Sequence, residues 1–294
     1  MKKYKLYPTL LASLLGLVFP FQGSSFSQQS SGNNIDFSIN LEKESYVLSE
    51  PIWVDVSVKN ISNNDINILP LVLSCMECLQ VFLINSKSDT LFYHGMVADV
   101  TRPPTGYATE PGNTRSNYFN LLESFGEKLD GFGMRRFLKA DKYLIVAIYN
   151  SGIQSNKIEF EVCAPQRDEK KAHALLKEGY DYQIQMKITE FDSKFEELVT
   201  KYPKSMYTEV AYYEMTYWTE DPKDAEKYGK ELILKYPDSR FTRFAFWKML
   251  RGKTRRQQIE FLKDILKNIP VDTRAYDWAQ GSLKGLEEKD KSEK

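Results

Sequence analysis

The chain changes character within residues 158–179, which read IEFEVCAPQRDEKKAHALLKEG. In residues 158–162 apolar and acidic side chains alternate, which is the period of a β-strand with one buried face. From Gln166 onward Lys, Glu, Ala and Leu predominate with helical spacing, and Pro165 marks the break. This stretch therefore predicts strands on its N-terminal side and helices on its C-terminal side.

The two-residue period recurs throughout residues 35–162. It is clearest at 35–41 and at 52–58, which are separated by a turn containing Glu50 and Pro51. Further candidate strands lie at 66–69, 79–84, 91–94, 118–122, 143–149 and 158–162, and the breaks between strands are rich in Asn, Ser, Gly and Pro. Because no amphipathic helix interrupts these short strands, they predict an antiparallel β-sandwich over residues 34–164.

The C-terminal part contains an internal repeat. The sequence KYPKS at 201–205 recurs as KYPDS at 235–239, an offset of 34 residues, and a weaker break follows at Pro270. A period of this length is typical of stacked helix pairs. We therefore expect an α-helical repeat domain over residues 166–286, followed by a disordered, charged tail at 287–294.

Two candidate helices, 205–218 and 223–235, lie between the copies of the repeat. Pro222 suits the first turn of the second helix, where a missing N–H group costs nothing. Ser205 and Ser239, which follow the repeated prolines, are expected to act as N-caps.

The strand-rich part resembles bacterial Ig-like domains. Residues 46–52 (YVLSEPI) match an opening in which a turn with an acid and a proline leads into the second strand. Residues 140–149 (ADKYLIVAIY) and 156–162 resemble the closing hairpin, although Asp141 and Lys142 stand where a glycine is usual. Proteinase-inhibitor domains of the Bacillus intracellular type share these features. The resemblance implies an Ig-like β-sandwich and transfers no binding residue.

The helical part resembles the tetratricopeptide (TPR)-like repeats of bacterial cell-envelope proteins, in which a Tyr-Pro-x-Ser break separates successive helix pairs. Ala225 falls where the family has a small residue in the second helix. Tyr212 and Tyr213 depart from the pattern, because they stand near a position that is normally small. Together the two resemblances imply an antiparallel Ig-like β-sandwich followed by α-helical TPR-like hairpin repeats.

The N-terminus has the composition of a secretory signal peptide, predicted here as residues 1–27. Three lysines precede an apolar run at 10–19, and Pro20 and a small polar stretch up to Ser27 follow it. The run is about half of the roughly 20 residues that cross a bilayer, which favours cleavage after Ser27 over the alternative of an uncleaved anchor. No cysteine follows the run, as a lipoprotein would require. We expect an exported, soluble protein, periplasmic or secreted, with no stable membrane insertion after cleavage.

Charge and histidine content argue against several functions. The formal net charge is +0, and loss of the three leader lysines leaves −3, so no strong positive field favours nucleic acid. The chain has only His94 and His173, neither at metal-ligand spacing, and it has no nucleophile elbow or phosphate-binding loop. We predict no enzyme, no catalytic residue, no metal and no cofactor. A hydrolase built from carboxylates that meet only in the fold stays open.

Three cysteines are present. Cys75 and Cys78 have C-x-x-C spacing, but they lie between strand-like segments and no second pair exists, which disfavours a redox site and a zinc ribbon. In an oxidising compartment we predict a local disulfide between them. Pairing of either one with Cys163 and three free thiols are the alternatives.

Aromatic and basic residues gather on the predicted helices around 207–218 and 240–256. Side chains three or four residues apart share a helix face, so we expect most of the aromatic residues to be core and the rest to line a groove. The basic stretch is either a solvated face or a site for an acidic peptide or polymer. The candidate partner-binding residues are Tyr213, Tyr217, Trp218, Arg240, Arg243, Trp247 and Arg251.

These patterns favour a non-catalytic scaffold that binds a protein or peptide of the cell envelope through its helices. One alternative is a proteinase inhibitor that inserts the proline-containing loop 101–113 into a protease cleft. Another is a carbohydrate-binding or enzyme-accessory protein that uses Trp53 or the helical aromatic residues.

Overall fold

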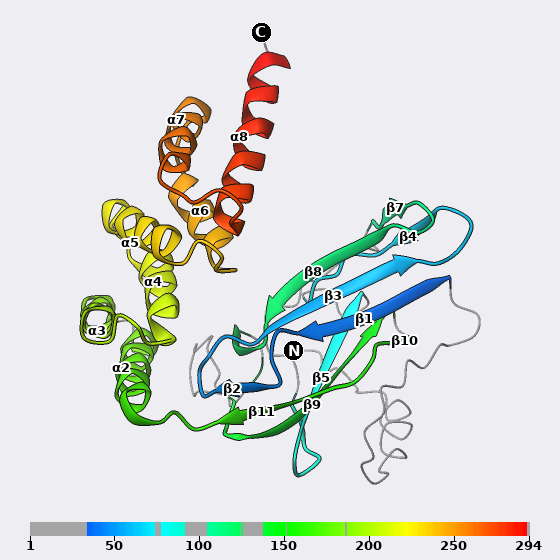
Figure 1. Cartoon of the computed structure of the whole chain (residues 1–294), viewed down its shortest axis with the longest axis horizontal. Helices are drawn as coiled ribbons and strands as arrows, with labels where there is room; N and C mark the ends of the chain where they lie inside the picture. The colour runs from blue at the N-terminus through cyan, green and yellow to red at the C-terminus, as the bar shows by residue number, and fades with distance from the viewer. Residues whose placement is uncertain are drawn as a thin grey trace, which may run out of the picture. The chain divides into compact units, whose positions relative to one another are not determined.

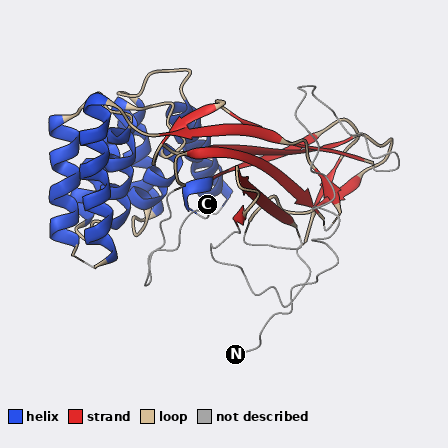
Figure 2. Cartoon of the chain, turned by 90° about the horizontal axis from the view of Figure 1, so that it is seen from below, coloured by secondary structure: helices blue, strands red, loops and turns tan. Residues whose placement is uncertain are grey.

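The computed structural model describes residues 34–73, 78–91, 105–123, 125, 138–150, 152–185 and 187–292 (Figure 1). The chain passes from strands to helices between Cys163 and Arg167, as the sequence around Pro165 predicted. Figure 2 distinguishes the strands in red from the helices in blue. The described residues form one compact unit. The predicted signal peptide lies outside the described residues, and the predicted domain boundaries stay a prediction.

All the strands found among the described residues lie between Ile35 and Cys163. These are β1 (Ile35–Leu41), β2 (Ser45–Val47), β3 (Trp53–Asn60), β4 (Ile66–Ile68), β5 (Leu79–Asn85), β6 (Thr90–Leu91), β7 (Tyr107–Thr109), β8 (Thr114–Asn120), β9 (Asp141–Tyr149), β10 (Ile153–Gln154) and β11 (Ile158–Cys163). A short 3₁₀ helix, η1 (Leu121–Glu123), follows β8.

The helices follow in the C-terminal half. They are α2 (Arg167–Ile184), α3 (Ile188–Lys201), α4 (Tyr207–Trp218), α5 (Pro222–Lys235), α6 (Thr242–Leu250), α7 (Arg255–Leu266) and α8 (Arg274–Ser292). Helix α5 begins at Pro222 as predicted, and the Asp221 side chain caps it by accepting from the Lys223 N–H at 2.7 Å. Helix α8 extends to Ser292 and so includes residues 287–292, while the predicted disorder of the tail at 287–294 stays a prediction.

The strands form three separate sheets. One has the order β1-β3-β8, a second has the order β2-β11-β9-β5-β6 with β10 paired to β9, and β4 pairs with β7 in the third. All pairs are antiparallel except β2 with β11, which run parallel and align Ser45 with Glu161.

The prediction of an antiparallel Ig-like β-sandwich is wrong. The structure is a mixed α and β fold with several small sheets, one of which contains a parallel pair. The sequence pattern located most strands correctly, since β1 spans the predicted residues 35–41. Alternation, however, reports which face of a strand is buried and not which strand lies beside it. The partners of β2 and β4 therefore could not be inferred from it.

The prediction of TPR-like repeats is also wrong. The helices that follow the two Tyr-Pro breaks differ in length, since α4 has 12 residues and α6 has 9. Helix α4 buries the bulky Tyr212 and Tyr213 where the repeat requires a small residue. The helices found among the described residues range from 9 residues in α6 to 19 in α8, so the C-terminal half is a set of unequal helices.

The 34-residue offset instead marks a recurring turn. The backbone N–H of Ser205 bonds to Tyr202 O at 2.9 Å, and that of Ser239 bonds to Tyr236 O at 2.9 Å. Each serine hydroxyl accepts from the N–H two residues later, at Tyr207 and at Phe241. The prediction that Ser205 and Ser239 are N-caps is wrong, because the N-cap residues are Met206 and Phe241; each serine instead bonds within the turn that leads into its helix.

Two hydrophobic cores organise the described residues. One lies among the strands, and the other lies among the helices and includes Trp53 from β3. The Trp53 ring packs edge-on against Phe241 at a centroid distance of 5.0 Å. The Tyr207 hydroxyl donates to Leu48 O at 2.7 Å. Strand residues thus complete the helical core at its edge.

Candidate functional site

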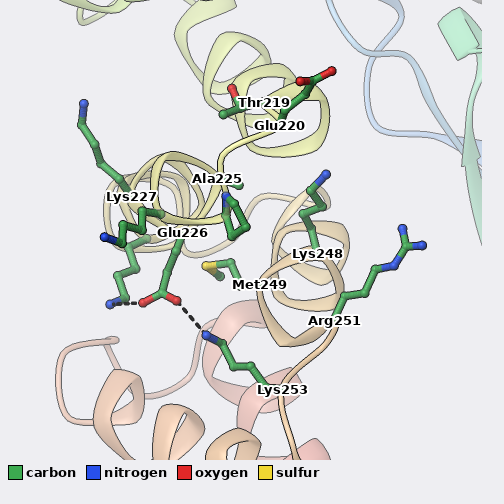
Figure 3. A pocket seen from close by; sticks show the side chains of 12 residues that line it. Thr219, Glu220, Ala225, Glu226, Lys227, Lys248, Met249, Arg251 and Lys253 are labelled. Atoms are coloured by element: carbon green, nitrogen blue, oxygen red, sulfur yellow. Dashed lines mark hydrogen bonds and ion pairs between the residues drawn. The ribbon is translucent and has the colours of Figure 1, made fainter.

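A cavity of about 630 Å³ lies between the start of α5 and the end of α6 (Figure 3). Its apolar lining comes from Pro222 and Ala225 of α5 and Met249 of α6, while Thr219 and Glu220 line one side from the turn before α5. The remaining lining residues are charged. We call this cavity the basic pocket.

Positive charge predominates in the basic pocket. Six cationic residues line it, against the two carboxylates of Glu220 and Glu226; the cations are Lys223, Lys227, Lys230, Lys248, Arg251 and Lys253. The N-terminus of α5, at Pro222, adds the positive end of a helix dipole. The sum of these charges favours an anionic ligand.

One carboxylate is already held in this pocket. Glu226 accepts from Lys230 Nζ at 2.8 Å and from Lys253 Nζ at 2.9 Å, through its two different oxygens (Figure 3). Burial alone would raise the pKa of Glu226, but the bonds from Lys230 and Lys253 outweigh it and lower the pKa. Glu226 is therefore ionised at neutral pH and joins α5 to the segment that follows α6.

Other cations of the pocket have no such partner. Lys248 Nζ donates to the Tyr217 carbonyl oxygen at 2.8 Å, and burial together with the neighbouring Arg251 lowers its pKa. Among the described residues, Lys223, Lys248 and Arg251 form no ion pair with a carboxylate. These three groups are therefore free to bind an anion.

Two exposed aromatic residues stand beside these cations, and we call them the aromatic rim. Trp247 is 54% exposed and Tyr217 is 38% exposed. The Arg251 guanidinium lies 5.5 Å from the Trp247 ring centroid, and Lys248 Nζ lies 5.7 Å from that of Tyr217. Such cation–π contacts fix the orientation of flexible side chains at a surface.

Local sequence explains why Trp247 is exposed. The buried residues of α6 include Thr242, Ala245, Phe246 and Met249, which follow the spacing of one helix face. Trp247 falls off that face and points to solvent.

The structure divides the predicted partner-binding residues. Tyr217, Arg243, Trp247 and Arg251 are exposed, and Trp218 is partly buried. Tyr213 is buried and stacks on Phe241, with a centroid distance of 4.2 Å and an interplanar angle of 18°. Arg240 is buried too, in ion pairs with Asp55 and Glu42. Tyr213 and Arg240 are therefore not accessible to a partner, and of the seven only Arg251 lines the pocket.

The sequence analysis missed the part of the pocket that α5 contributes. Lys223, Lys227 and Lys230 are spaced by four and three residues, which places them on one helix face. That spacing was a usable signal, but only the tertiary structure shows that this face lies opposite Lys248 and Arg251.

The remaining candidate residues lie elsewhere or outside the described residues. Cys75 and His94 are outside them, Cys78 is buried, and Cys163 is a free thiol, so the local disulfide stays a prediction. Trp53, proposed for carbohydrate binding, is only 6% exposed. Of the candidate inhibitor loop 101–113, residues 105–113 are described and include β7.

The described ranges contain neither a candidate metal site nor a helix that could span a membrane. Those residues contain no group of three or more His, Cys, Asp or Glu side chains placed to hold a metal ion. In the same part of the chain, every helix is too short or too polar to cross a membrane.

Comparison with known proteins adds no assignment. No family model matches the sequence, and no curated protein does. Solved structures with partial likeness include a β-glucosidase of Erythrobacter marinus (18% identity, TM-score 0.28), covering 44% of this chain and 15% of that one. The alkylpurine DNA glycosylase AlkC of Pseudomonas fluorescens has 9% identity and a TM-score of 0.29 over 45% of this chain and 31% of that one. The sporulation control protein Spo0M of Bacillus subtilis has 15% identity and a TM-score of 0.23 over 49% and 54%. The chain thus spans well under two thirds of each protein, and likeness at these TM-scores supports no conclusion about fold or function.

Proposed function

We propose that this protein is a non-catalytic binding protein whose C-terminal helices hold an acidic segment of another protein. The supporting observation is the exposed Trp247, with Arg251 on its ring, at the edge of a pocket in which positive charge predominates. Exposed aromatic and arginine side chains are enriched in protein interfaces. Together with the predicted export, this suggests a partner in the cell envelope.

The charge of the site identifies the kind of partner. Lys223, Lys248 and Arg251 have no carboxylate partner within the described residues, so an acidic segment would complete their ion pairs. Charge complementarity of this kind raises the association rate and excludes basic partners. The aromatic rim would then supply the apolar contact that charges alone do not.

The proposal can be tested with three fluorescein-labelled 12-residue peptides that differ only in charge: one acidic, one neutral and one basic. Fluorescence anisotropy should show binding of the acidic peptide. Trp247→Ala and Tyr217→Ala should each weaken it by about 10-fold, as expected for an aromatic anchor.

Tyr107→Ala is the matched control. Tyr107 is 56% exposed and lies under Arg115 at 5.6 Å, so it has the same kind of aromatic–arginine contact on β7. Equal affinity for the acidic and basic peptides would contradict the proposal. The proposal would also be contradicted if Trp247→Ala and Tyr217→Ala bound the acidic peptide as tightly as Tyr107→Ala does.

A further inference from the structure

Glu226 occupies the basic pocket in the manner expected of a ligand. Its two oxygens receive ammonium groups from two different segments, Lys230 within α5 and Lys253 in the turn before α7. Glu226 and Lys230 are one helical turn apart, but Lys253 reaches Glu226 across the pocket (Figure 3). The protein's own carboxylate therefore shows how this pocket binds a carboxylate.

The pocket also has capacity that Glu226 does not use. Lys223, Lys248 and Arg251 remain without a carboxylate among the described residues, and the volume of about 630 Å³ exceeds what one carboxylate needs. The lowered pKa of Lys248, caused by burial and by the neighbouring Arg251, indicates a cation whose charged form an incoming anion would stabilise. Of these cations, Lys223 comes from α5 whereas Lys248 and Arg251 come from the end of α6, and cations from two elements suit several separate carboxylates.

We infer that the basic pocket anchors a run of acidic residues and that Glu226 limits its affinity, because it competes with the ligand for Lys230 and Lys253. This inference rests on the proposed function and specifies its ligand and regulation. Lys223, Lys248 and Arg251 receive the first carboxylates. Lys230 and Lys253 become available only when Glu226 is displaced.

The alternative role for Glu226 is purely structural, as a strut between α5 and the segment after α6. The two roles predict opposite effects of Glu226→Gln, which keeps the size of the side chain and removes its charge. A competitor, once neutralised, leaves two more ammonium groups for the ligand and raises its affinity. A strut, once neutralised, loosens the pocket and lowers the affinity.

The test uses the full chain and labelled hexaglutamate, with affinity measured by anisotropy at two salt concentrations. Glu226→Gln should bind about 3- to 10-fold more tightly than the unchanged protein, and the double variant Lys223→Gln/Lys248→Gln about 10-fold more weakly. Raising the salt concentration should reduce all three affinities. Glu260→Gln is the matched control, because Glu260 is an exposed carboxylate that pairs with Arg256 on α7.

Several outcomes would overturn the inference. An equal gain in Glu226→Gln and Glu260→Gln would show an effect of net charge alone, and a lower affinity in Glu226→Gln would show a strut. Tighter binding of hexametaphosphate, whose six phosphate groups match the six side-chain carboxylates of hexaglutamate in number, would show a phosphate site instead.

The inference and the proposed function can fail separately. If Glu226→Gln tightens hexaglutamate binding but Trp247→Ala leaves binding of the 12-residue acidic peptide unchanged, the pocket binds carboxylates and the proposed function is wrong. If Trp247→Ala weakens binding of the 12-residue acidic peptide but Glu226→Gln leaves hexaglutamate binding unchanged, the proposed function stands and the inference about Glu226 is wrong.

Discussion

Arg240 and Asp55 form a bidentate ion pair that joins the turn before α6 to strand β3. Arg240 Nη1 lies 2.6 Å from Asp55 Oδ1, and Nη2 lies 2.8 Å from Oδ2. The guanidinium also donates from Nε to Glu42 Oε1 at 2.8 Å and lies 5.1 Å from the Tyr118 ring centroid. The Arg240 side chain is only 6% exposed, so a residue from the basic stretch of the sequence has a structural role here.

Replacing Arg240 with alanine should destabilise the protein strongly. The change leaves Asp55 and Glu42 without their cation and removes the contact with Trp53 and Tyr118. Because both carboxylates are about 40% exposed and water screens them, we expect a loss of about 2 to 3 kcal/mol and not the full cost of a buried pair. Urea denaturation measures this loss in the free energy of unfolding directly.

Arg256→Ala is the control. In this variant an 89% exposed arginine loses its pair with Glu260, which should change the free energy of unfolding by less than about 0.5 kcal/mol. Equal losses in the two variants would contradict the structural role of Arg240.

Gly179→Ala should destabilise helix α2 by overpacking. A Cβ atom at this position would lie 2.9 Å from ring carbons of Phe195, which is fully buried and cannot move away freely. We expect the free energy of unfolding to fall by about 1 to 3 kcal/mol. Gly285→Ala in α8 is the control, because within the described residues nothing lies within 4 Å of its added Cβ. That variant should gain up to about 1 kcal/mol from its better helix propensity. If the melting temperatures of Gly179→Ala and Gly285→Ala shifted in the same direction, the packing argument would be refuted.

His173 should make stability depend on pH. Its Nε2 lies 3.0 Å from Ser49 Oγ, and its ring lies 5.5 Å from that of Tyr207. Burial, and secondly the charge of Lys177, lower the pKa of His173 below its ordinary value. The unfolded chain therefore takes up the proton first as the pH falls. The stability contribution is fully present above about pH 6.5 and is lost as the pH falls from there toward the lowered folded pKa.

The His173 prediction is tested by the difference between two proteins. Buried carboxyl groups such as Asp192 and Glu209 have raised pKa values and change stability in the opposite direction, so a single pH curve mixes the effects. The free energy of unfolding between pH 5 and pH 7.5 should rise less steeply in His173→Gln than in the unchanged protein. Parallel curves for the two proteins would show that this imidazole does not contribute.

Tyr207→Phe should weaken the connection between the helices and the strands. The Tyr207 hydroxyl donates to Leu48 O at 2.7 Å, and the Tyr207 side chain is fully buried. Removing the hydroxyl group leaves the Leu48 carbonyl oxygen without that donor and should lower the free energy of unfolding by about 1 to 2 kcal/mol. Tyr236→Phe is the control, because its hydroxyl bonds to Pro203 O at 3.5 Å in an exposed position. A loss in Tyr236→Phe as large as that in Tyr207→Phe would contradict the argument.

Most of the secondary structure could be located from local sequence patterns, because periodicity and turn residues act over short distances along the chain. Strand β1 was predicted residue for residue, helices α4 and α5 were predicted to within two residues, and Pro222 does begin α5. The basic stretch after Arg240 also contains Lys248, Arg251 and Lys253, which line the basic pocket, and its role in binding stays a prediction. These features depend on neighbours within one turn or one strand.

How those elements associate, and which side chains stay exposed, follows from long-range packing that local patterns do not contain. The parallel pairing of β2 with β11 and the ion pair of Arg240 with Asp55 join residues more than 100 positions apart, and no local pattern encodes them. Tyr213 and Trp247 looked equivalent as aromatic residues on neighbouring helices, yet Tyr213 stacks on Phe241 and Trp247 faces solvent. Helical spacing shows which residues share a face, but whether that face is buried depends on what packs against it.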